Sequence, residues 1–394
     1  MMLSEAEAAA AVLAKVAPLP RVEAQLIDSL GRFAARDVHA VRSLPPFDNS
    51  AMDGYAVQAT SCAAGARLRV VGEQPAGQDR GLAISAGEAL RIFTGAPMPA
   101  GADAVIMQED VTREGETIVA NYGVEPGEFF RRRGSDLAEG QTILSVGEII
   151  TPAVVGLLSS QGMATIEVGA RPRVAIVSTG DELARPGETP QPGQIFESNS
   201  VMLHALALAA GAEINWITHS PDDLDRLVEI LRHGLDHDVL IVSGGVSVGD
   251  RDFVKPALRQ LGAEIDLWRV AIKPGKPFLF GRTTRCAIFG LPGNPVSGFV
   301  TFLKLVRPAL RKLAGASAEH SSLRYVPAQL RADLTNDGDR PHYFHGRLDG
   351  GVFSLSGRQE SHALFGLSRA NALLRVAPGA RLTTGATVSV ELWD

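Results

Sequence analysis

Three short loops rich in small residues each follow an apolar run of the chain. STGDEL follows RVAIVS, SGGVSVGD follows VLIVSG, and GLPGNPVS follows AIFGL. Each loop leads toward a predicted helix N-terminus, where free backbone N–H groups and the helix dipole favour an anion. Glycine after a strand is also ordinary turn chemistry, but three such loops in one predicted sheet favour a phosphate or oxyanion cradle. The candidate substrate-binding residues of these loops are Gly244, Gly245, Ser247, Pro292, Asn294 and Pro295.

Carboxylates occupy two of the same loops, with Asp181 and Glu182 in the first and Asp250 and Asp252 in the second. Carboxylates beside a phosphate repel it unless a hard divalent cation lies between them, and Mg²⁺ prefers one or two carboxylates plus phosphate oxygens. The charge balance therefore predicts Mg²⁺ held by Glu182 and Asp252. Helix N-capping is the alternative for each carboxylate taken singly.

The segment AIKPGKPF holds two of the six lysines of the chain, Lys273 and Lys276, although most basic residues are arginines. The two prolines restrict the backbone, so both lysines project from a stiff turn and could hold phosphate as point charges. A solvated loop is the alternative. Asp222, in the PDD that opens a predicted helix, is a weaker substrate-binding candidate.

A second group of polar residues lies nearer the N-terminus. PPFDNSAMDGYAV contains Asp53, RIFTGAPMP places Thr94 after a strand, and RRRGSD puts three arginines before Asp136. The arginines mark a local anion-attracting patch in an acidic protein. A hairpin turn around Asp53 and a solvated arginine face are the alternatives.

The elements that position the three loops lie in residues 171–316, where apolar strands alternate with amphipathic helices. This alternation predicts a doubly wound parallel sheet covered by helices on both faces, with ligands bound at the carboxyl ends of its strands. The run PVSGFVTFLKLVRPALRKLAG predicts one long helix at its end.

The remaining sequence predicts three further parts of a multidomain α/β protein. Residues 1–44 plus 141–170 form a helical linker domain, with a helix over VEAQLIDSLGR; residues 45–140 form an inserted β-rich domain; residues 321–394 form a C-terminal β-barrel-like domain. A chain of 394 residues has ample length for several such cores.

Composition excludes several classes of protein. The formal charge of −6 gives no global basic field for nucleic acid or an anionic membrane, and no stretch is apolar and long enough to cross a bilayer. The two cysteines, Cys62 and Cys286, lie far apart and are expected to be free thiols, and the N-terminus lacks the basic start of a signal peptide. We therefore expect a cytoplasmic protein with no nucleic-acid or membrane partner.

Seven segments, in this order along the chain, closely resemble the molybdopterin molybdenumtransferase family (MoeA and the E domain of gephyrin): PPFDNSAMDGYAV, RIFTGAPMPAGADAVIMQED, RRRGSD, VSTGDEL, SGGVSVGDRDF, AIKPGKPF and GLPGNPVS. The resemblance implies insertion of molybdenum into adenylylated molybdopterin, with molybdate and Mg²⁺ used and AMP released. It also implies a homodimer in which the module with Asp53 and Asp136 belongs to the partner subunit. A molybdopterin adenylyltransferase and molybdoenzymes or their chaperones become candidate partners.

By motif match, the resemblance assigns the reaction to the residues Asp53, Thr94, Asp136, Glu182, Asp252, Lys273 and Lys276. The loop IFESNS departs from the family pattern, because Glu197 stands where Asp is typical; Ser198 and Asn199 remain as expected caps. Position 250 is Asp where Glu is frequent. Two alternatives remain: the shorter related adenylyltransferase, which would lack the β-rich insert and the C-terminal β-domain, and a dimeric scaffold that binds a receptor.

Overall fold

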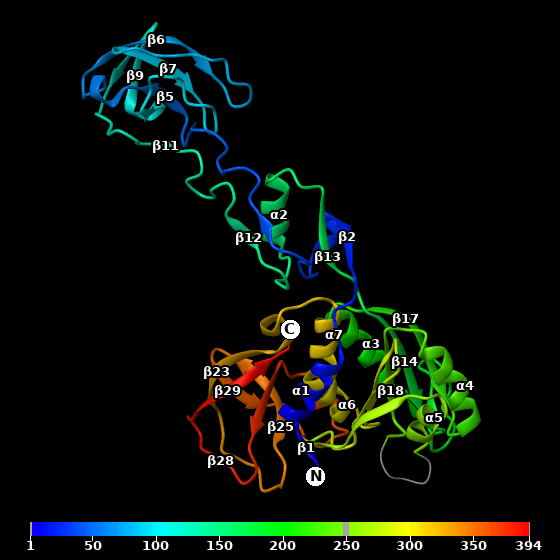
Figure 1. Cartoon of the computed structure of the whole chain (residues 1–394). Helices are drawn as coiled ribbons and strands as arrows, with labels where there is room; N and C mark the ends of the chain where they lie inside the picture. The colour runs from blue at the N-terminus through cyan, green and yellow to red at the C-terminus, as the bar shows by residue number, and fades with distance from the viewer. Residues whose placement is uncertain (1, 247–251, 394) are drawn as a thin grey trace. The chain divides into compact units, whose positions relative to one another are not determined.

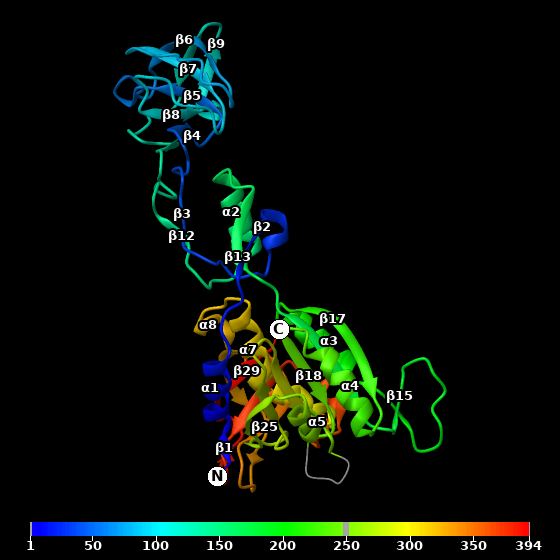
Figure 2. The same ribbon diagram turned by 45° about the vertical axis from the view of Figure 1, so that its right-hand side comes forward.

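The computed structural model describes residues 2–246 and 252–393. Its contacts divide the chain into two compact units, which Figures 1 and 2 show from two directions. Unit 1 comprises Met1–Arg36, Val146–Gly156 and Met163–Asp394, and unit 2 comprises Asp37–Ser145 and Leu157–Gly162. The four-part division expected from the sequence is finer than this, and each unit is described below by itself.

Unit 1 is organised around a six-stranded sheet. Its strands, in spatial order, are β17 (Glu213–Ser220), β14 (Arg173–Thr179), β18 (Val239–Ser243), β22 (Ala287–Leu291), β21 (Leu279–Arg282) and β19 (Glu264–Trp268). The first four run parallel, whereas β21 and β19 add an antiparallel edge. All residues of β18 and β22 are buried, which explains their unbroken apolar sequences.

Helices cover both faces of this sheet, as the doubly wound pattern predicts (Figures 1 and 2). One face packs against α1 (Glu5–Lys15), α3 (Asn199–Ala209), α6 (Pro295–Thr301) and α7 (Arg307–Leu313). The other packs against α4 (Leu224–Gly234) and α5 (Val254–Gln260). In α4 the inward residues Leu227 and Leu231 are four positions apart, which is the spacing of one helical face. The predicted fold class is confirmed.

The single long helix expected after β22 is interrupted. A π-helical turn, Phe302–Val306, separates α6 from α7. The cause is Pro308, which lacks an N–H group and whose ring would clash with the carbonyl of Lys304 in a regular helix. Lys304 in this turn donates to both carboxylate oxygens of the buried Glu391, at 2.6 and 2.7 Å.

The prediction of a helix over VEAQLIDSLGR is wrong. This segment forms β2 (Arg21–Gln25) and a 3₁₀ turn, Leu26–Ser29. The strand pairs antiparallel with β13 (Thr165–Gly169), so pairing with a distant strand overrides the local helical spacing. The predicted helical linker thus contains strands as well as α2 (Pro152–Ser160), while α1 packs into the core of unit 1.

The C-terminal part of unit 1 is a closed five-stranded barrel. Its strands, in spatial order, are β23 (Arg324–Leu330), β26 (Val352–Leu355), β25 (His342–Asp349), β27 (Ala372–Val376) and β29 (Thr387–Leu392). Alternate residues such as Ala328 and Leu330 point into its apolar core. The predicted C-terminal barrel is confirmed.

Unit 2 is a β structure. Its main sheet has the spatial order β8 (Ala104–Met107), β5 (Gly54–Val57), β7 (Glu88–Ile92), β6 (Arg67–Gln74), β10 (Thr117–Ala120) and β9 (Val111–Glu114). Apolar side chains pack in two clusters, one of which contains Cys62. Both Cys62 and Cys286 are free, as expected, and both are buried. Among the residues that the structure describes, no helix is long and apolar enough to cross a membrane.

Candidate active site

The three predicted loops lie side by side because their strands are in register. Ser178 of β14 pairs with Ser243 of β18, and Ser243 pairs with Leu291 of β22. The residues that follow these strands therefore leave the sheet at one edge, which is where open α/β sheets bind ligands. They contribute to a cavity of about 560 Å³, whose lining includes Glu182, Gly245, Asp252, Pro292, Asn294 and Pro295. Ser247, like Asp250, lies outside the described residues.

Backbone conformation at the first two loops requires glycine. Gly244 has φ +93°, and a Cβ atom there would lie 2.8 Å from the carbonyl oxygen of Thr179. Gly180 has φ +140°, and the carboxylate of Glu182 folds back against it, in space that a side chain would fill. Glycine thus lets the loops after β14 and β18 approach each other closely.

The loop that carries Glu182 is also fixed from the side of β17. The ring of His219 hydrogen-bonds through Nε2 with the carbonyl of Gly180, at 2.8 Å. The backbone N–H of Asp222 donates to Asp181 Oδ1, at 3.0 Å. Asp222 is not among the described residues that line the cavity, so the structure places it beside the Glu182 loop rather than in the cavity wall.

Two residues near the start of α3 join this cavity. Asn199 donates from Nδ2 to Ser243 Oγ, at 3.1 Å, and to the carbonyl of Gly293, at 2.6 Å, and so connects the loops after β18 and β22. Glu197 accepts from the N–H of Ser200, at 2.7 Å, and from its hydroxyl group. The expectation that Ser198 caps α3 is wrong, since its side chain makes no capping bond; Glu197 caps the helix from the preceding position.

Lys273 and Lys276 line a second cavity, of about 730 Å³. The two cavities share Pro277, Asn294, Ser297 and His362, so together they form one continuous groove. The N–H of Lys273 donates to Pro341, and its carbonyl accepts from Tyr343, at 2.9 and 2.7 Å. These bonds attach the lysine turn to the barrel.

The barrel side of the groove supplies residues that the sequence interpretation missed, above all Arg340 and His342. Arg340 donates to the carbonyl of Ile272, at 2.9 Å, and adds a third cation beside the lysines. Burial, together with the charge of Lys273, lowers the pKa of His342 to about 4, so its imidazole is neutral at pH 7. The sequence signal is DRPHYFHG, an arginine and two histidines at the start of a strand, but nothing local connects it with a lysine turn 65 residues earlier.

The donor set fits the divalent cation expected from the sequence. Glu182 and Asp252 line the same cavity, next to the anion-binding loops. Within residues 2–246 and 252–393, no group of three His, Cys, Asp or Glu side chains could hold a metal by itself. Mg²⁺ prefers this arrangement, in which two carboxylates bind the ion and oxygens of the substrate complete its coordination shell.

In unit 2 the structure brings together two of the three predicted residues. The N–H and hydroxyl groups of Thr94 both donate to Asp53 Oδ1, at 2.8 and 2.9 Å. These bonds lower the pKa of the Asp53 carboxyl below its usual value. Asp136 is exposed, and its backbone N–H donates to the carbonyl of Leu44, at 3.0 Å.

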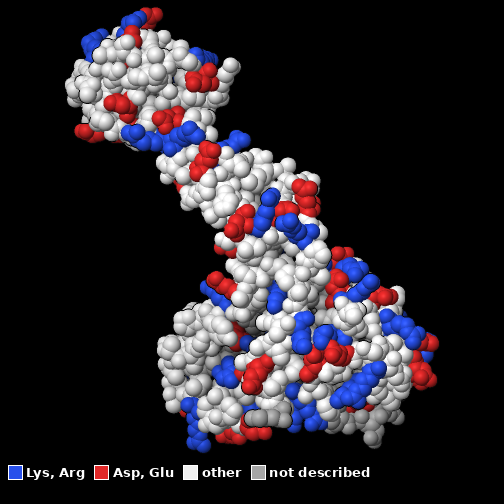
Figure 3. Space-filling view, viewed as in Figure 1, with Lys and Arg blue, Asp and Glu red and all other residues white. Residues whose placement is uncertain are grey.

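The predicted arginine patch, Arg131–Arg133, is exposed on unit 2. The backbone N–H of Arg133 donates to Asp48 Oδ1, at 2.7 Å, which fixes the turn, and Arg132 lies over the ring of Phe130. On the face of unit 1 seen in Figure 3, acidic and basic side chains are interspersed, so that face has no extended field of one sign. Anion binding on that face would therefore depend on local groups.

Comparison with known proteins covers nearly the whole chain. The MoeA N-terminal region (domain I and II) matches residues 3–162, the family described as "Probable molybdopterin binding domain" matches residues 175–312, and the MoeA C-terminal region (domain IV) matches residues 327–393. A solved MoeA protein from Pyrococcus horikoshii OT3 is similar over 100% of both chains, with 29% sequence identity and a TM-score of 0.86.

Curated relatives agree with these matches. Molybdopterin molybdenumtransferase 2 of Mycobacterium tuberculosis H37Rv is 38% identical over 382 residues, which is 94% of each chain. Molybdopterin molybdenumtransferase of Haemophilus influenzae is 39% identical over 292 residues, covering 74% of this chain and 72% of that one. With all of its segments matched in order, the chain belongs to the MoeA family of molybdopterin molybdenumtransferases.

Proposed function

We propose that this protein inserts molybdenum from molybdate into adenylylated molybdopterin, with Mg²⁺, and releases AMP to give molybdenum cofactor. Family membership supports the reaction class. The observation that carries the proposal is the continuous groove of unit 1, which combines glycine loops at strand ends, two carboxylates and three cations. A substrate with a phosphoanhydride and a co-substrate that is a tetrahedral dianion need these groups together.

The phosphate groups of the adenylylated substrate fit the part of the groove at the strand ends. Backbone N–H groups near Gly245 and Asn294 are suited to phosphate oxygens, and glycine lets the backbone come close. Asn199 maintains the spacing between these two loops through its bonds to Ser243 and Gly293. Ser243 and Gly293 are thus held at a fixed spacing before the substrate binds, which lowers the cost of binding.

Molybdate fits the end of the groove that holds Lys273, Lys276 and Arg340. Lysine binds a tetrahedral dianion as a point charge, and arginine adds fixed donors. His342 is neutral there, so it contributes a ring nitrogen without adding charge. Its Nε2 atom is buried and has no hydrogen-bond partner among the described residues, so it is available to a bound oxyanion as a donor in the appropriate tautomer.

Glu182 and Asp252 would hold Mg²⁺ between the carboxylates and the phosphate oxygens. When bound, the ion would neutralise the charge that develops on the departing AMP. Glu182 is held for this role by the bonds of its loop to His219 and to Asp222. From the family resemblance we also propose that the protein is a homodimer, and that Asp53, Thr94 and Asp136 contribute to the reaction.

The direct test is metal transfer. Purified protein, adenylylated molybdopterin, molybdate and Mg²⁺ are mixed with a molybdoenzyme that lacks its cofactor, and the activity of that enzyme is measured. We expect reconstitution that requires both molybdate and Mg²⁺. Unchanged reconstitution when this protein is omitted would refute the proposal, as would tight binding of the substrate with no transfer.

A further inference from the structure

Two large apolar residues of unit 1, Ile195 and Phe196, are exposed although they line the strand-end cavity, with exposed fractions of 60% and 51%. Neither belongs to the two apolar clusters that cover the faces of the six-stranded sheet. Among the residues that the structure describes, no other aromatic ring packs against Phe196. A phenyl ring at a substrate cavity, with no ring contact in its own chain, is available to a planar ligand.

The position of Phe196 is fixed by backbone pairing beside the Glu182 loop. Phe196 lies in β16 (Ile195–Phe196), which pairs parallel with β15 (Leu183–Ala184). The N–H groups of Ile195 and Glu197 donate to the carbonyls of Glu182 and Ala184, each at 2.8 Å. Figure 2 shows the segment that joins the two strands as a long loop projecting from unit 1. The strand pairing thus keeps Phe196 next to Glu182 despite this long connection.

The charges of the strand-end cavity favour an uncharged group beside Phe196. Three carboxylates, those of Glu182, Glu197 and Asp252, line the cavity, and none of its described lining residues is Lys or Arg. Phosphate oxygens have the backbone N–H groups of the glycine loops, but a second anion near Phe196 would face carboxylates without a lysine or arginine. A neutral heterocycle does not meet this repulsion.

The order of groups along the groove indicates which part of the substrate lies there. Phe196 lines only the strand-end cavity, whereas Lys273 and Lys276 line only the other. In adenylylated molybdopterin the phosphoanhydride joins the adenosine to the pterin part, whose dithiolene takes the molybdenum. With molybdate at the lysines and the phosphates at the strand ends, the adenosine extends away from the lysines and remains in the cavity with Phe196.

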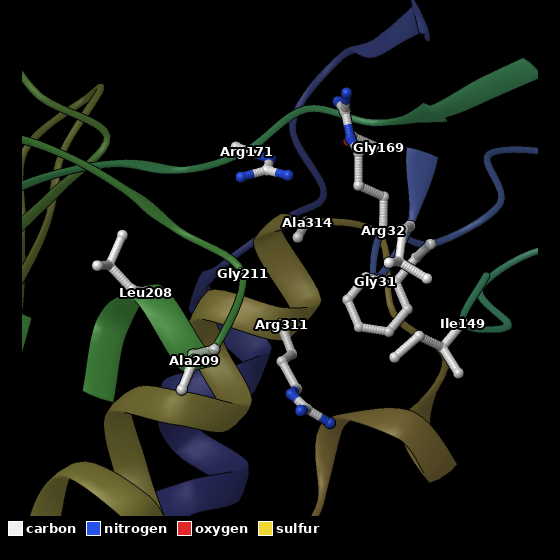
Figure 4. A pocket seen from close by; sticks show the side chains of 13 residues that line it. Gly31, Arg32, Ile149, Gly169, Arg171, Leu208, Ala209, Gly211, Arg311 and Ala314 are labelled. Carbon is white, nitrogen blue, oxygen red and sulfur yellow. Dashed lines mark hydrogen bonds between the residues drawn. The ribbon is translucent and has the colours of Figure 1, made fainter. Parts of the chain in front are cut away.

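A smaller cavity of unit 1, shown in Figure 4, provides a contrast. Its volume is about 220 Å³, and Arg32 and Arg311 are among its lining residues. Their guanidinium groups point away from each other (Figure 4) and donate to the backbone carbonyls of Gly169 and His320, at 2.9 and 2.8 Å. These side chains hold the fold together, whereas the exposed ring of Phe196 makes no comparable contact among the described residues.

We infer that the ring of Phe196 stacks on the adenine of the adenylylated substrate, an inference that rests on the function proposed above. Adenine is planar and uncharged at pH 7, and an aromatic side chain offers it a flat apolar face. Stacking removes one face of each ring from water. It also orients the adenosine, so that the phosphoanhydride lies at the glycine loops beside Glu182.

Two other occupants of this surface predict different results. The pterin ring of the substrate is also planar, and stacking on it would make pterin binding, rather than AMP binding, depend on Phe196. A second copy of the chain could cover Ile195 and Phe196 instead, and removal of the ring would then change the oligomeric state and leave the affinity for AMP unaltered.

The test measures the contribution of the adenine ring to binding. AMP, ribose 5-phosphate, which lacks the ring, and 6-hydroxymethylpterin are titrated separately into the full-length protein by calorimetry at one Mg²⁺ concentration. The variants are Phe196→Ala, which removes the ring, and Phe196→Trp, which keeps an aromatic face. Phe365→Ala is the matched control, because Phe365 is 75% exposed on α9 (Leu364–Leu367) and lines neither part of the groove.

We expect Phe196→Ala to bind AMP about tenfold more weakly and ribose 5-phosphate as the wild type does, while Phe196→Trp and Phe365→Ala keep the wild-type affinity for AMP. Equal weakening of AMP and ribose 5-phosphate would overturn the inference, because the substitution would then act on the phosphate loops. Unchanged AMP binding in Phe196→Ala would overturn it as well. Weaker pterin binding would in that case indicate the pterin ring, and an altered mass in sedimentation would indicate a second copy.

The metal-transfer assay distinguishes failure of this inference from failure of the proposed function. Transfer by the wild type, together with unchanged AMP binding in Phe196→Ala, would overturn the stacking and leave the function standing. Absence of transfer by the wild type, together with AMP binding that depends on Phe196, would overturn the function and leave an adenine site. Thermal unfolding of each variant checks that it is folded.

Discussion

The candidate residues of unit 1 and of unit 2 are brought together by different means. In unit 1 they come from loops between residues 182 and 294 and meet because the parallel strands β14, β18 and β22 end in register. In unit 2 Asp53 and Thr94 meet through a direct pair of hydrogen bonds between loops of an antiparallel region. The ends of parallel strands therefore assemble the first site, whereas in the second the antiparallel pairing of Gly54 with Ile92 places Asp53 near Thr94 and two hydrogen bonds then join them.

This difference has a consequence for substitutions. A site built by strand register has a backbone that persists when one side chain is changed, so a substitution there should alter chemistry more than structure. The contact between Asp53 and Thr94 depends on one pair of hydrogen bonds, so it should be lost with either partner although β5 and β7 stay paired.

The largest effect should come from the lysine turn of unit 1. Replacing both Lys273 and Lys276 by Gln removes two of the three cations of that part of the groove, and we expect kcat/KM for molybdate-dependent AMP release to fall by about 100-fold or more. Lys15→Gln, an exposed lysine of α1, is the control. The double variant should unfold at the wild-type temperature, and activity within a few-fold of wild type would contradict the role of the lysines.

The next effect concerns pH and His342. Its pKa is about 4 in the folded protein and 6.5 in the unfolded chain, so between these values the unfolded chain binds a proton that the folded protein does not. Stability contributed by the neutral imidazole is complete above pH 6.5, falls as pH drops toward 4 and does not fall further below that. Across this pH range, the loss in the free energy of unfolding of unit 1 amounts to about 3 kcal/mol.

Urea unfolding from pH 7 to pH 4 tests this. In His342→Gln the slope of unfolding free energy against pH should become shallower in this window, and unfolding of unit 2 should not change. An unaltered slope would show that folding does not lower the pKa of His342.

A backbone substitution tests how tightly the strand-end loops approach. Gly244→Ala places a Cβ atom at φ +93° near Thr179, and we expect a loss of about 1–3 kcal/mol in the free energy of unfolding. Gly293→Ala is the matched control, because its nearest neighbour would be 3.7 Å away and its φ is ordinary. Equal stability of the two variants would mean that the loops can separate without cost.

The smallest effect should be at the Asp53–Thr94 pair of unit 2. The pKa of Asp53 is lowered from 3.8 in the folded protein. Its hydrogen bonds therefore stabilise unit 2 above pH 3.8, and this stabilisation is lost as pH falls through the lowered pKa. Asp53→Asn should therefore destabilise unit 2 slightly at pH 7, and its difference from the wild type should disappear as pH falls through the lowered pKa of Asp53. Thr94→Val, which keeps the backbone donor, should have a smaller effect than Asp53→Asn. The reverse order would show that the hydroxyl bond dominates.

The same contrast explains what could be predicted from sequence. The strand-end loops were recognisable because apolar runs fix the strands and parallel strands place their ends together. The helix expected over Val22–Arg32 was not formed, because pairing of β2 with β13 depends on a segment about 140 residues away. The capping role of Glu197 depends on where α3 begins, which composition does not define to one residue.

The barrel residues of the groove were also beyond prediction. Arg340 and His342 reach the lysine turn through backbone bonds from Lys273 to Pro341 and Tyr343, and these are tertiary contacts without a local pattern. The pairing of Asp53 with Thr94 depends on the register of β5 with β7, two strands that the sequence does not show to be partners. The sequence therefore predicts those parts of each site that lie on recognisable strands and helices, and not the contacts between distant segments.

We propose that the strand-end groove of unit 1 performs the chemistry, with Glu182 as a carboxylate of the reacting site. The most direct measurement is AMP release from adenylylated molybdopterin, with and without molybdate and Mg²⁺, by the wild-type protein and by Glu182→Ala. We predict release that depends on molybdate in the wild type and is lost in the variant, while substrate binding is retained. Tight binding of the substrate without AMP release by the wild type, or full release by the variant, would contradict the claim.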